Sequence, residues 1–173
     1  LKLVTASVGF LALPFIYLSG KEIANRKVGL LAFLLAASAY WPNVVSRVGL
    51  RLPFYIFFTA ALFYFLVRGL RRNSRNDFIL AGIFLGLSFY GYSADRILPL
   101  LVLAAAGLFL IHRQPADRRT SVMTGLTALI AVSFVVFIPL LSYILSEPDL
   151  FFQRTFTRMA YWERPISDPV LLI

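Results

Sequence analysis

The sequence predicts an all-α protein, a multi-pass transmembrane helical bundle with about six spanning helices. Of its 173 residues, 60% are hydrophobic and 14% are charged, and the mean hydropathy is +0.80. A soluble domain of this length is rarely so apolar. Ten-residue strands of alternating polarity, which a membrane β-barrel needs, do not occur. Helices are therefore expected, because they satisfy their own backbone groups within lipid.

Six apolar stretches reach or approach the roughly 20 residues that cross a hydrocarbon core of about 30 Å. They are Leu3–Ser19, Val28–Val45, Leu52–Val67, Phe78–Ser93, Ile97–Ile111 and Val122–Leu145. The third and fifth are short, and we expect interfacial residues or local thinning of the bilayer to complete them. Pro139 in the last stretch has no backbone N–H and can kink a helix there.

Residues 1–145 are predicted to form the transmembrane core, and residues 146–173 an extracytoplasmic or interfacial segment that leads into a further helix. The opening run lacks the basic flank and the cleavage site of a secretory signal, so we interpret it as a spanning helix. The chain begins at Leu1 inside an apolar run and ends inside another at Ile173. Both ends look cut, and we expect the chain to be a fragment.

The Lys and Arg residues predict the orientation of the helices. Ten lie in the gaps after the first, third and fifth stretches, which are Lys21, Arg26, Lys27, Arg68, Arg71, Arg72, Arg75, Arg113, Arg118 and Arg119. Seven lie on the other side, which are Lys2, Arg47, Arg51, Arg96, Arg154, Arg158 and Arg164. Because short cytoplasmic loops are enriched in basic residues, the side with ten is assigned to the cytoplasm. This pattern explains the net charge of +9 better than nucleic-acid binding does.

Arginines between the second and third stretches are the first candidate site. Arg47 and Arg51 lie on the predicted outer side, and arginine can donate paired hydrogen bonds to a phosphate. They would then clamp a lipid phosphate or pyrophosphate. The alternative is that they extend to headgroups and only anchor the helices.

The second candidate site lies after the fourth stretch and contains Tyr90, Tyr92 and Arg96. These side chains can line a polar pocket for a lipid-linked or sugar substrate, or the tyrosines can belong to an aromatic belt at the interface. Asp95 is a candidate partner for Arg96, in either a salt bridge or a site.

No other constellation points to chemistry. Cysteine is absent, His112 is the only histidine, and no P-loop, Gly-x-Ser-x-Gly elbow or metal-ligand spacing occurs. The tail segment Phe151–Arg158 mixes arginines with aromatics and is expected to lie on the membrane surface or to cover a cavity. No cofactor is evident, and assistance by a divalent metal has no support in the sequence.

Three motifs in order resemble bacterial members of the GT-C glycosyltransferase superfamily, the relatives of dolichyl-phosphate-mannose protein mannosyltransferases and lipid A aminoarabinose transferases. They are Pro14–Ala32, Ser46-Arg47-x-Gly49-x-Arg51 and Gly86-Leu87-x-x-Tyr90-x-Tyr92-x-x-x-Arg96-x-x-Pro99. The resemblance spans about Pro14 to Pro99. Asp95 departs from it, because relatives usually have a small residue at that position.

The resemblance implies transfer of a sugar from a polyprenyl-phosphate donor to an acceptor on the extracytoplasmic side, with inversion at the anomeric carbon. It implies a bacterial inner-membrane location and a catalytic acid in a first outer loop upstream of Leu1, so no acid in the chain receives that role. It also implies that Arg47, Arg51, Tyr90, Tyr92 and Arg96 bind the donor phosphate or substrate. The fragment alone is expected to be inactive.

Two other functions stay open from the residues alone. A transporter or flippase could use the outer arginines to bind an anionic lipid-linked substrate, although transporters usually carry midplane charges and internal repeats. A purely structural membrane subunit would leave those arginines without a site.

Overall fold

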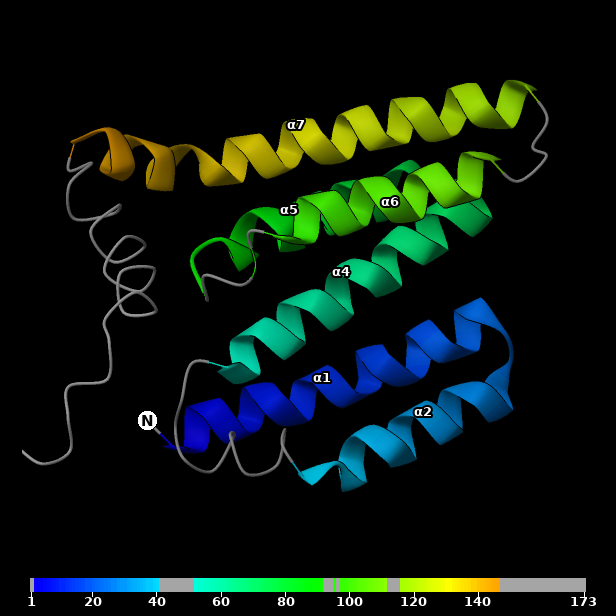
Figure 1. The fold of residues 1–173 in the computed structure, drawn as a ribbon, viewed down its shortest axis with the longest axis vertical. Coiled ribbons are helices and arrows are strands. Elements are labelled where there is room, and N and C mark those ends of the chain that lie inside the picture. Colours follow the sequence, from blue (N-terminus) through cyan, green and yellow to red (C-terminus); the bar gives the residue numbers. More distant parts are fainter. Residues whose placement is uncertain (1, 41–51, 92–94, 96, 112–115, 147–173) are drawn as a thin grey trace, which may run out of the picture. The chain divides into compact units, whose positions relative to one another are not determined.

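The computed structural model describes residues 2–40, 52–91, 95, 97–111 and 116–146, and within these ranges the regular structure is helical. The helices are α1 (Lys2–Ile23), α2 (Arg26–Ser38), α4 (Leu52–Arg72), α5 (Arg75–Ser88), α6 (Leu98–Ile111) and α7 (Ala116–Ser146) (Figure 1). The predicted all-α fold with about six helices is confirmed.

The chain forms two compact units, Leu1–Phe137 and Ile138–Ile173. Among the described helices, the first unit contains α1, α2, α4, α5, α6 and most of α7. The described part of the second unit is the remainder of α7, which includes Pro139.

Asparagines mark two of the turns between helices. Asn25 caps α2, because its side-chain oxygen accepts a hydrogen bond from the backbone N–H of Val28 at 3.0 Å. Asn73 follows the last residue of α4 with φ of 56°, the left-handed conformation that often ends a helix and that asparagine tolerates. α5 therefore starts two residues later, at Arg75.

Two predicted stretches end earlier than expected. α2 ends at Ser38, and Ala39 is extended with ψ of 128°; Pro42 lacks the N–H that a continuous helix would direct at the Ser38 carbonyl. α5 ends at Ser88, because Tyr90 and Gly91 bond to the carbonyls three residues back, Leu87 and Ser88. These tighter bonds replace the α-helical pattern before Ser93 is reached.

The core of the first unit is built around α4, which contacts α1, α5 and α6, while α2 contacts α1. Leu62, Leu66 and Leu70 recur every four residues and so share one buried face of α4. They belong to a buried cluster with residues of three other helices, which are Phe78, Ala81, Leu85, Leu98, Val102, Val122 and Leu129. The long polar side chains remain outside this cluster, at the helix ends.

Glycines allow two pairs of helices to approach backbone to backbone. A Cβ at Gly20 of α1 would lie 2.9 Å from the Cα of Gly29 in α2, and a Cβ at Gly82 of α5 would lie 2.5 Å from the Leu129 carbonyl oxygen in α7. Only a residue without a side chain fits such contacts, as in many membrane helix pairs.

Three of the described helices are long and apolar enough to cross a bilayer, over Leu3–Ile23, Pro53–Arg72 and Asp117–Ser146. The other three have 13 or 14 residues, about 20 Å at 1.5 Å per residue, which is less than the hydrocarbon thickness. Leucines on them are nevertheless exposed, such as Leu35 at 62% and Leu108 at 71%. Such surface is favourable only in an apolar solvent, so it is assigned to contact with lipid.

Candidate functional site

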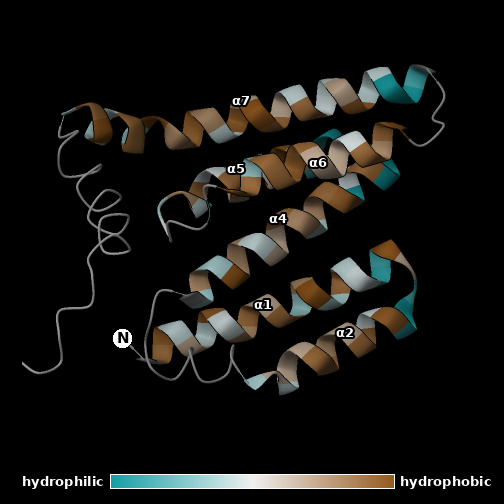
Figure 2. Cartoon of the chain, in the orientation of Figure 1, coloured by the Kyte–Doolittle hydropathy of each residue, from teal (hydrophilic) through white to brown (hydrophobic). Residues whose placement is uncertain are grey.

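The hydrophilic residues of the first unit gather at one end of its helices, which we call the basic end. It comprises the end of α1 with the start of α2, the end of α4 with the start of α5, and the first turn of α7 (Figure 2). The gaps after the first, third and fifth apolar stretches thus meet, as the alternation of spanning helices requires. α5 leads from this end to Tyr90, which lies just past its opposite end.

Of the five predicted substrate-binding residues, the structure describes Tyr90. The other four, Arg47, Arg51, Tyr92 and Arg96, lie outside the described residues. Their grouping with Tyr90 therefore stays a prediction.

Tyr90 contacts α7 rather than only solvent. Tyr90 is 47% exposed, and its hydroxyl donates a hydrogen bond to the carbonyl oxygen of Val136 at 2.9 Å. Phe89 beside it packs edge to face against Phe137, with ring centroids 5.2 Å apart. Since the Tyr90 proton is used in this bond, its oxygen is free to act as an acceptor toward a substrate but not as a donor.

Small and polar groups are buried next to Tyr90. The Ser88 hydroxyl is fully buried and donates to the Leu85 carbonyl at 2.7 Å. Asp95 is fully buried as well, and a Cβ at Gly91 would lie 3.2 Å from its Oδ2 atom. The glycine therefore admits the carboxylate to the turn that ends α5. Sequence reasoning named Asp95 only as a partner of Arg96 and did not predict this burial.

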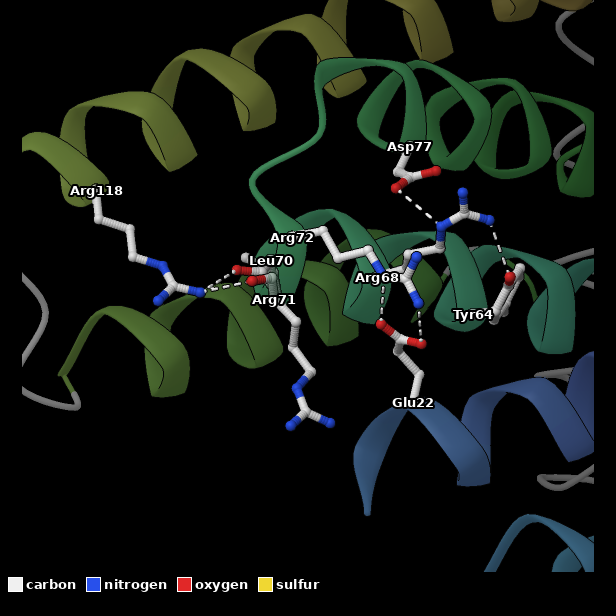
Figure 3. Close-up of polar contacts among 8 residues, drawn as sticks. All are labelled: Glu22, Tyr64, Arg68, Leu70, Arg71, Arg72, Asp77 and Arg118. Atoms are coloured by element: carbon white, nitrogen blue, oxygen red, sulfur yellow. Dashed lines mark hydrogen bonds and ion pairs between the residues drawn. The ribbon is translucent and has the colours of Figure 1, made fainter. Parts of the chain in front are cut away.

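At the basic end, Arg72 at the end of α4 forms a salt bridge with Glu22 at the end of α1 (Figure 3). The guanidinium donates from Nε to Oε1 at 2.8 Å and from Nη2 to Oε2 at 3.0 Å. This two-point geometry orients both groups. It joins residues 50 positions apart in the sequence.

Arg68, one turn earlier in α4, pairs with the first turn of α5. Its Nε lies 3.2 Å from Oδ2 of Asp77, whose side chain is only 4% exposed. Arg68 also donates to the Tyr64 hydroxyl at 3.0 Å (Figure 3). Asp77 is placed near the positive end of the α5 dipole, which adds to its stabilisation.

Arg118 and Arg119 at the start of α7 bind the carboxyl ends of other helices. Arg118 donates to the carbonyls of Leu70 and Arg71 at 3.2 and 2.7 Å, and Arg119 donates to the carbonyl of Leu110 at 3.0 Å. The last carbonyls of a helix have no partner within it, so these arginines cap α4 and α6. They are structural contacts, and they leave the basic end without an evident catalytic group among the described residues.

Sequence reasoning used these arginines only as a topology signal and missed their partners. Glu22 and Asp77 are the acids nearest to the basic gaps after the first and third apolar stretches, and that proximity is the signal that could have identified them. Within the described ranges, no three residues among His, Asp and Glu lie close enough together to hold a metal ion.

Fold and charge distribution define the class of protein, an integral membrane protein built from several helices. Residues 1–143 match the family model for dolichyl-phosphate-mannose-protein mannosyltransferases. The match covers most of the chain, and the protein belongs to this family of membrane glycosyltransferases, which confirms the resemblance seen in the sequence. No curated protein and no solved structure matches the chain.

Proposed function

We propose that this chain is part of a glycosyltransferase that moves a sugar from a polyprenyl-phosphate carrier to an acceptor on the extracytoplasmic side of a bacterial inner membrane. The observation that carries the proposal is membership of the mannosyltransferase family over residues 1–143. Family membership does not specify the polyprenyl-phosphate donor, the side on which the acceptor lies or the bacterial inner membrane, and these belong to the proposal.

The separation of the two helix ends supports the proposed sidedness. The basic end contains the loops that the positive-inside rule places in the cytoplasm. Tyr90 lies at the other end of α5, where the sequence also places Arg47 and Arg51. A donor that enters from the outer leaflet would present its phosphate at that level.

The chemistry of sugar transfer accounts for arginines on the outer side. When the bond between the anomeric carbon and the phosphate oxygen breaks, negative charge grows on the departing polyprenyl phosphate. Fixed cationic donors at a site of low dielectric stabilise that charge more than water does. Arg47, Arg51 and Arg96 would supply these donors, and the Tyr90 and Tyr92 hydroxyls would position the substrate.

Replacing Arg47 or Arg96 by Ala in the complete protein tests the proposal. Loss of one such donor is expected to lower the rate of transfer from a polyprenyl-phosphate sugar by about 10²–10³-fold. The matched control is Arg26→Ala, which removes an exposed arginine at the basic end. Normal transfer by well-folded R47A and R96A variants would contradict the assignment.

The same variants test the transporter hypothesis. A flippase would move a labelled lipid-linked substrate across vesicle membranes without forming a glycosylated product. Movement that depends on Arg47 and Arg96, with no product in the complete protein, would replace the proposed function with that one.

A further inference from the structure

A cavity of about 410 Å³ lies at the basic end, between the α4–α5 turn and the first turns of α7. Its wall includes Arg75 and Phe78 of α5 and a series of α7 residues, Asp117, Ser121, Thr124 and Gly125. The volume falls within the range of small-ligand sites. None of these residues belongs to the proposed sugar-transfer site, which is at the opposite end of α5.

The floor of this cavity is apolar and closely packed. Phe78 is 1% exposed, and a Cβ at Gly125 would lie 2.4 Å from the Phe78 ring. α7 can therefore pass directly over the ring only because Gly125 has no side chain. The close contact keeps the two walls of the cavity together.

The walls of the cavity are polar and carry one charge of each sign. Asp117, Ser121 and Thr124 are spaced by four and three residues, so they form one stripe along α7. Arg75 and Asp117 are both exposed, and neither forms an ion pair with another residue that the structure describes. The cavity thus offers a cation and an anion to one ligand.

The length of α7 places the cavity at the level of lipid headgroups. α7 has 31 residues, about 46 Å at 1.5 Å per residue, against a hydrocarbon core of about 30 Å. Its apolar part begins at Val122, so Asp117 and Ser121 extend into the headgroup region. The ligands most abundant at that level are phospholipid headgroups.

We propose that this cavity binds the headgroup of a zwitterionic phospholipid with a primary ammonium, of the phosphatidylethanolamine type. Arg75 pairs with the phosphate, and Asp117 accepts hydrogen bonds from the ammonium, while the Ser121 hydroxyl completes the contact. A choline headgroup has no N–H to donate to Asp117. A glycerol headgroup, as in phosphatidylglycerol, has no ammonium and would leave Asp117 without a cation.

Lipid binding to the purified complete protein in detergent tests this proposal by native mass spectrometry and by thermal stability. Phosphatidylethanolamine is expected to bind and to raise Tm more than phosphatidylcholine or phosphatidylglycerol. R75Q and D117N are each expected to weaken its binding about tenfold, the change that loss of one charge-assisted contact produces. R26Q, at an exposed arginine of the same end, is expected to bind as the unaltered protein does.

Several outcomes would overturn the proposal. One is binding of phosphatidylglycerol that is as tight as that of phosphatidylethanolamine, or tighter. Another is a D117N variant that still prefers ethanolamine over choline lipids. A third is equal stabilisation by soluble phosphoethanolamine and by the lipid, because that result would indicate a free metabolite as the ligand. The comparison of lipids on the unaltered protein needs no variant, and S121A offers a mild second substitution. Neither readout depends on sugar transfer, so failure here leaves the proposed function untouched.

Discussion

The two ion pairs at the basic end differ in how far each is removed from water. In the Arg68–Asp77 pair the side chains are 34% and 4% exposed, whereas in the Arg72–Glu22 pair they are 59% and 14% exposed. Exposed pairs contribute little to stability, but a cation left without its partner in a buried site is costly. The shorter, two-point contact of Arg72 is therefore not the stronger determinant of stability.

Asp77→Asn is accordingly expected to destabilise the protein more than Glu22→Gln. We expect a loss of about 1–3 kcal/mol for Asp77→Asn, less than for a fully buried pair because Arg68 is partly exposed, and about 0–1 kcal/mol for Glu22→Gln. Thermal unfolding of the two variants in the same detergent gives the comparison. An equal or larger fall in Tm for Glu22→Gln would show that burial does not rank these pairs.

Tyr90→Phe is expected to remove one hydrogen bond between the end of α5 and α7 while it keeps the ring. The loss is about 0.5–1.5 kcal/mol of stability. Tyr143→Phe is the matched control, because Tyr143 is 54% exposed and has no hydrogen bond to another described residue. If the two variants show the same Tm, the hydrogen bond from Tyr90 to Val136 contributes nothing to stability.

At the scale of helices, glycines decide which pairs can pack. Gly82 and Gly86 of α5 are four residues apart and share one face, and both lie against α7. A Cβ at Gly86 would lie 2.6 Å from Cβ of Val136, whereas a Cβ at Gly107 of α6 would have no neighbour within 4 Å. Replacing a glycine by alanine is therefore expected to be unfavourable where a helix is packed against another and favourable where it is not.

Gly82→Ala and Gly107→Ala form a matched pair that tests this difference. Overpacking against the Leu129 backbone is expected to make Gly82→Ala unfavourable by about 1–3 kcal/mol. Gly107→Ala is expected to stabilise its helix by up to about 1 kcal/mol, because alanine has the higher helix propensity. The Tm values of both variants check the prediction, and a tolerated Gly82→Ala would mean that α5 and α7 are not in backbone contact.

For the molecule as a whole, the structure requires that the basic gaps share one face of the membrane. The salt bridge from Glu22 to Arg72 and the hydrogen bonds from Arg118 to the end of α4 bring the three gaps together. The positive-inside rule predicts that this face is the cytoplasmic one.

Because the chain contains no cysteine, single introduced cysteines can report its topology. Ala24→Cys and Asn76→Cys are expected to react with an impermeant thiol reagent only from the cytoplasmic side, and Ile97→Cys only from the other side. All three positions are exposed. Labelling of Ala24→Cys and Asn76→Cys from opposite sides would contradict the arrangement, and labelling of all three from one side would show that α5 does not cross.

The sequence by itself determined the helical class and the approximate helices, because in an apolar solvent each segment must satisfy its own backbone hydrogen bonds. Each of the six apolar stretches overlaps one of the described helices. It also determined the family, through motifs that are local in the chain. The ends at Ser38 and Ser88 were missed, because hydropathy registers neither the missing N–H of Pro42 after α2 nor the turn bonds that stop α5.

Only the tertiary structure decided which polar groups meet. Glu22 lies 50 positions from Arg72, and Tyr90 lies 46 positions from Val136, so no local pattern connects them. The cavity beside Phe78 likewise depends on α7 crossing α5 at Gly125. Such contacts follow from how the helices pack, and packing is set by the fit of side chains that are distant in the chain.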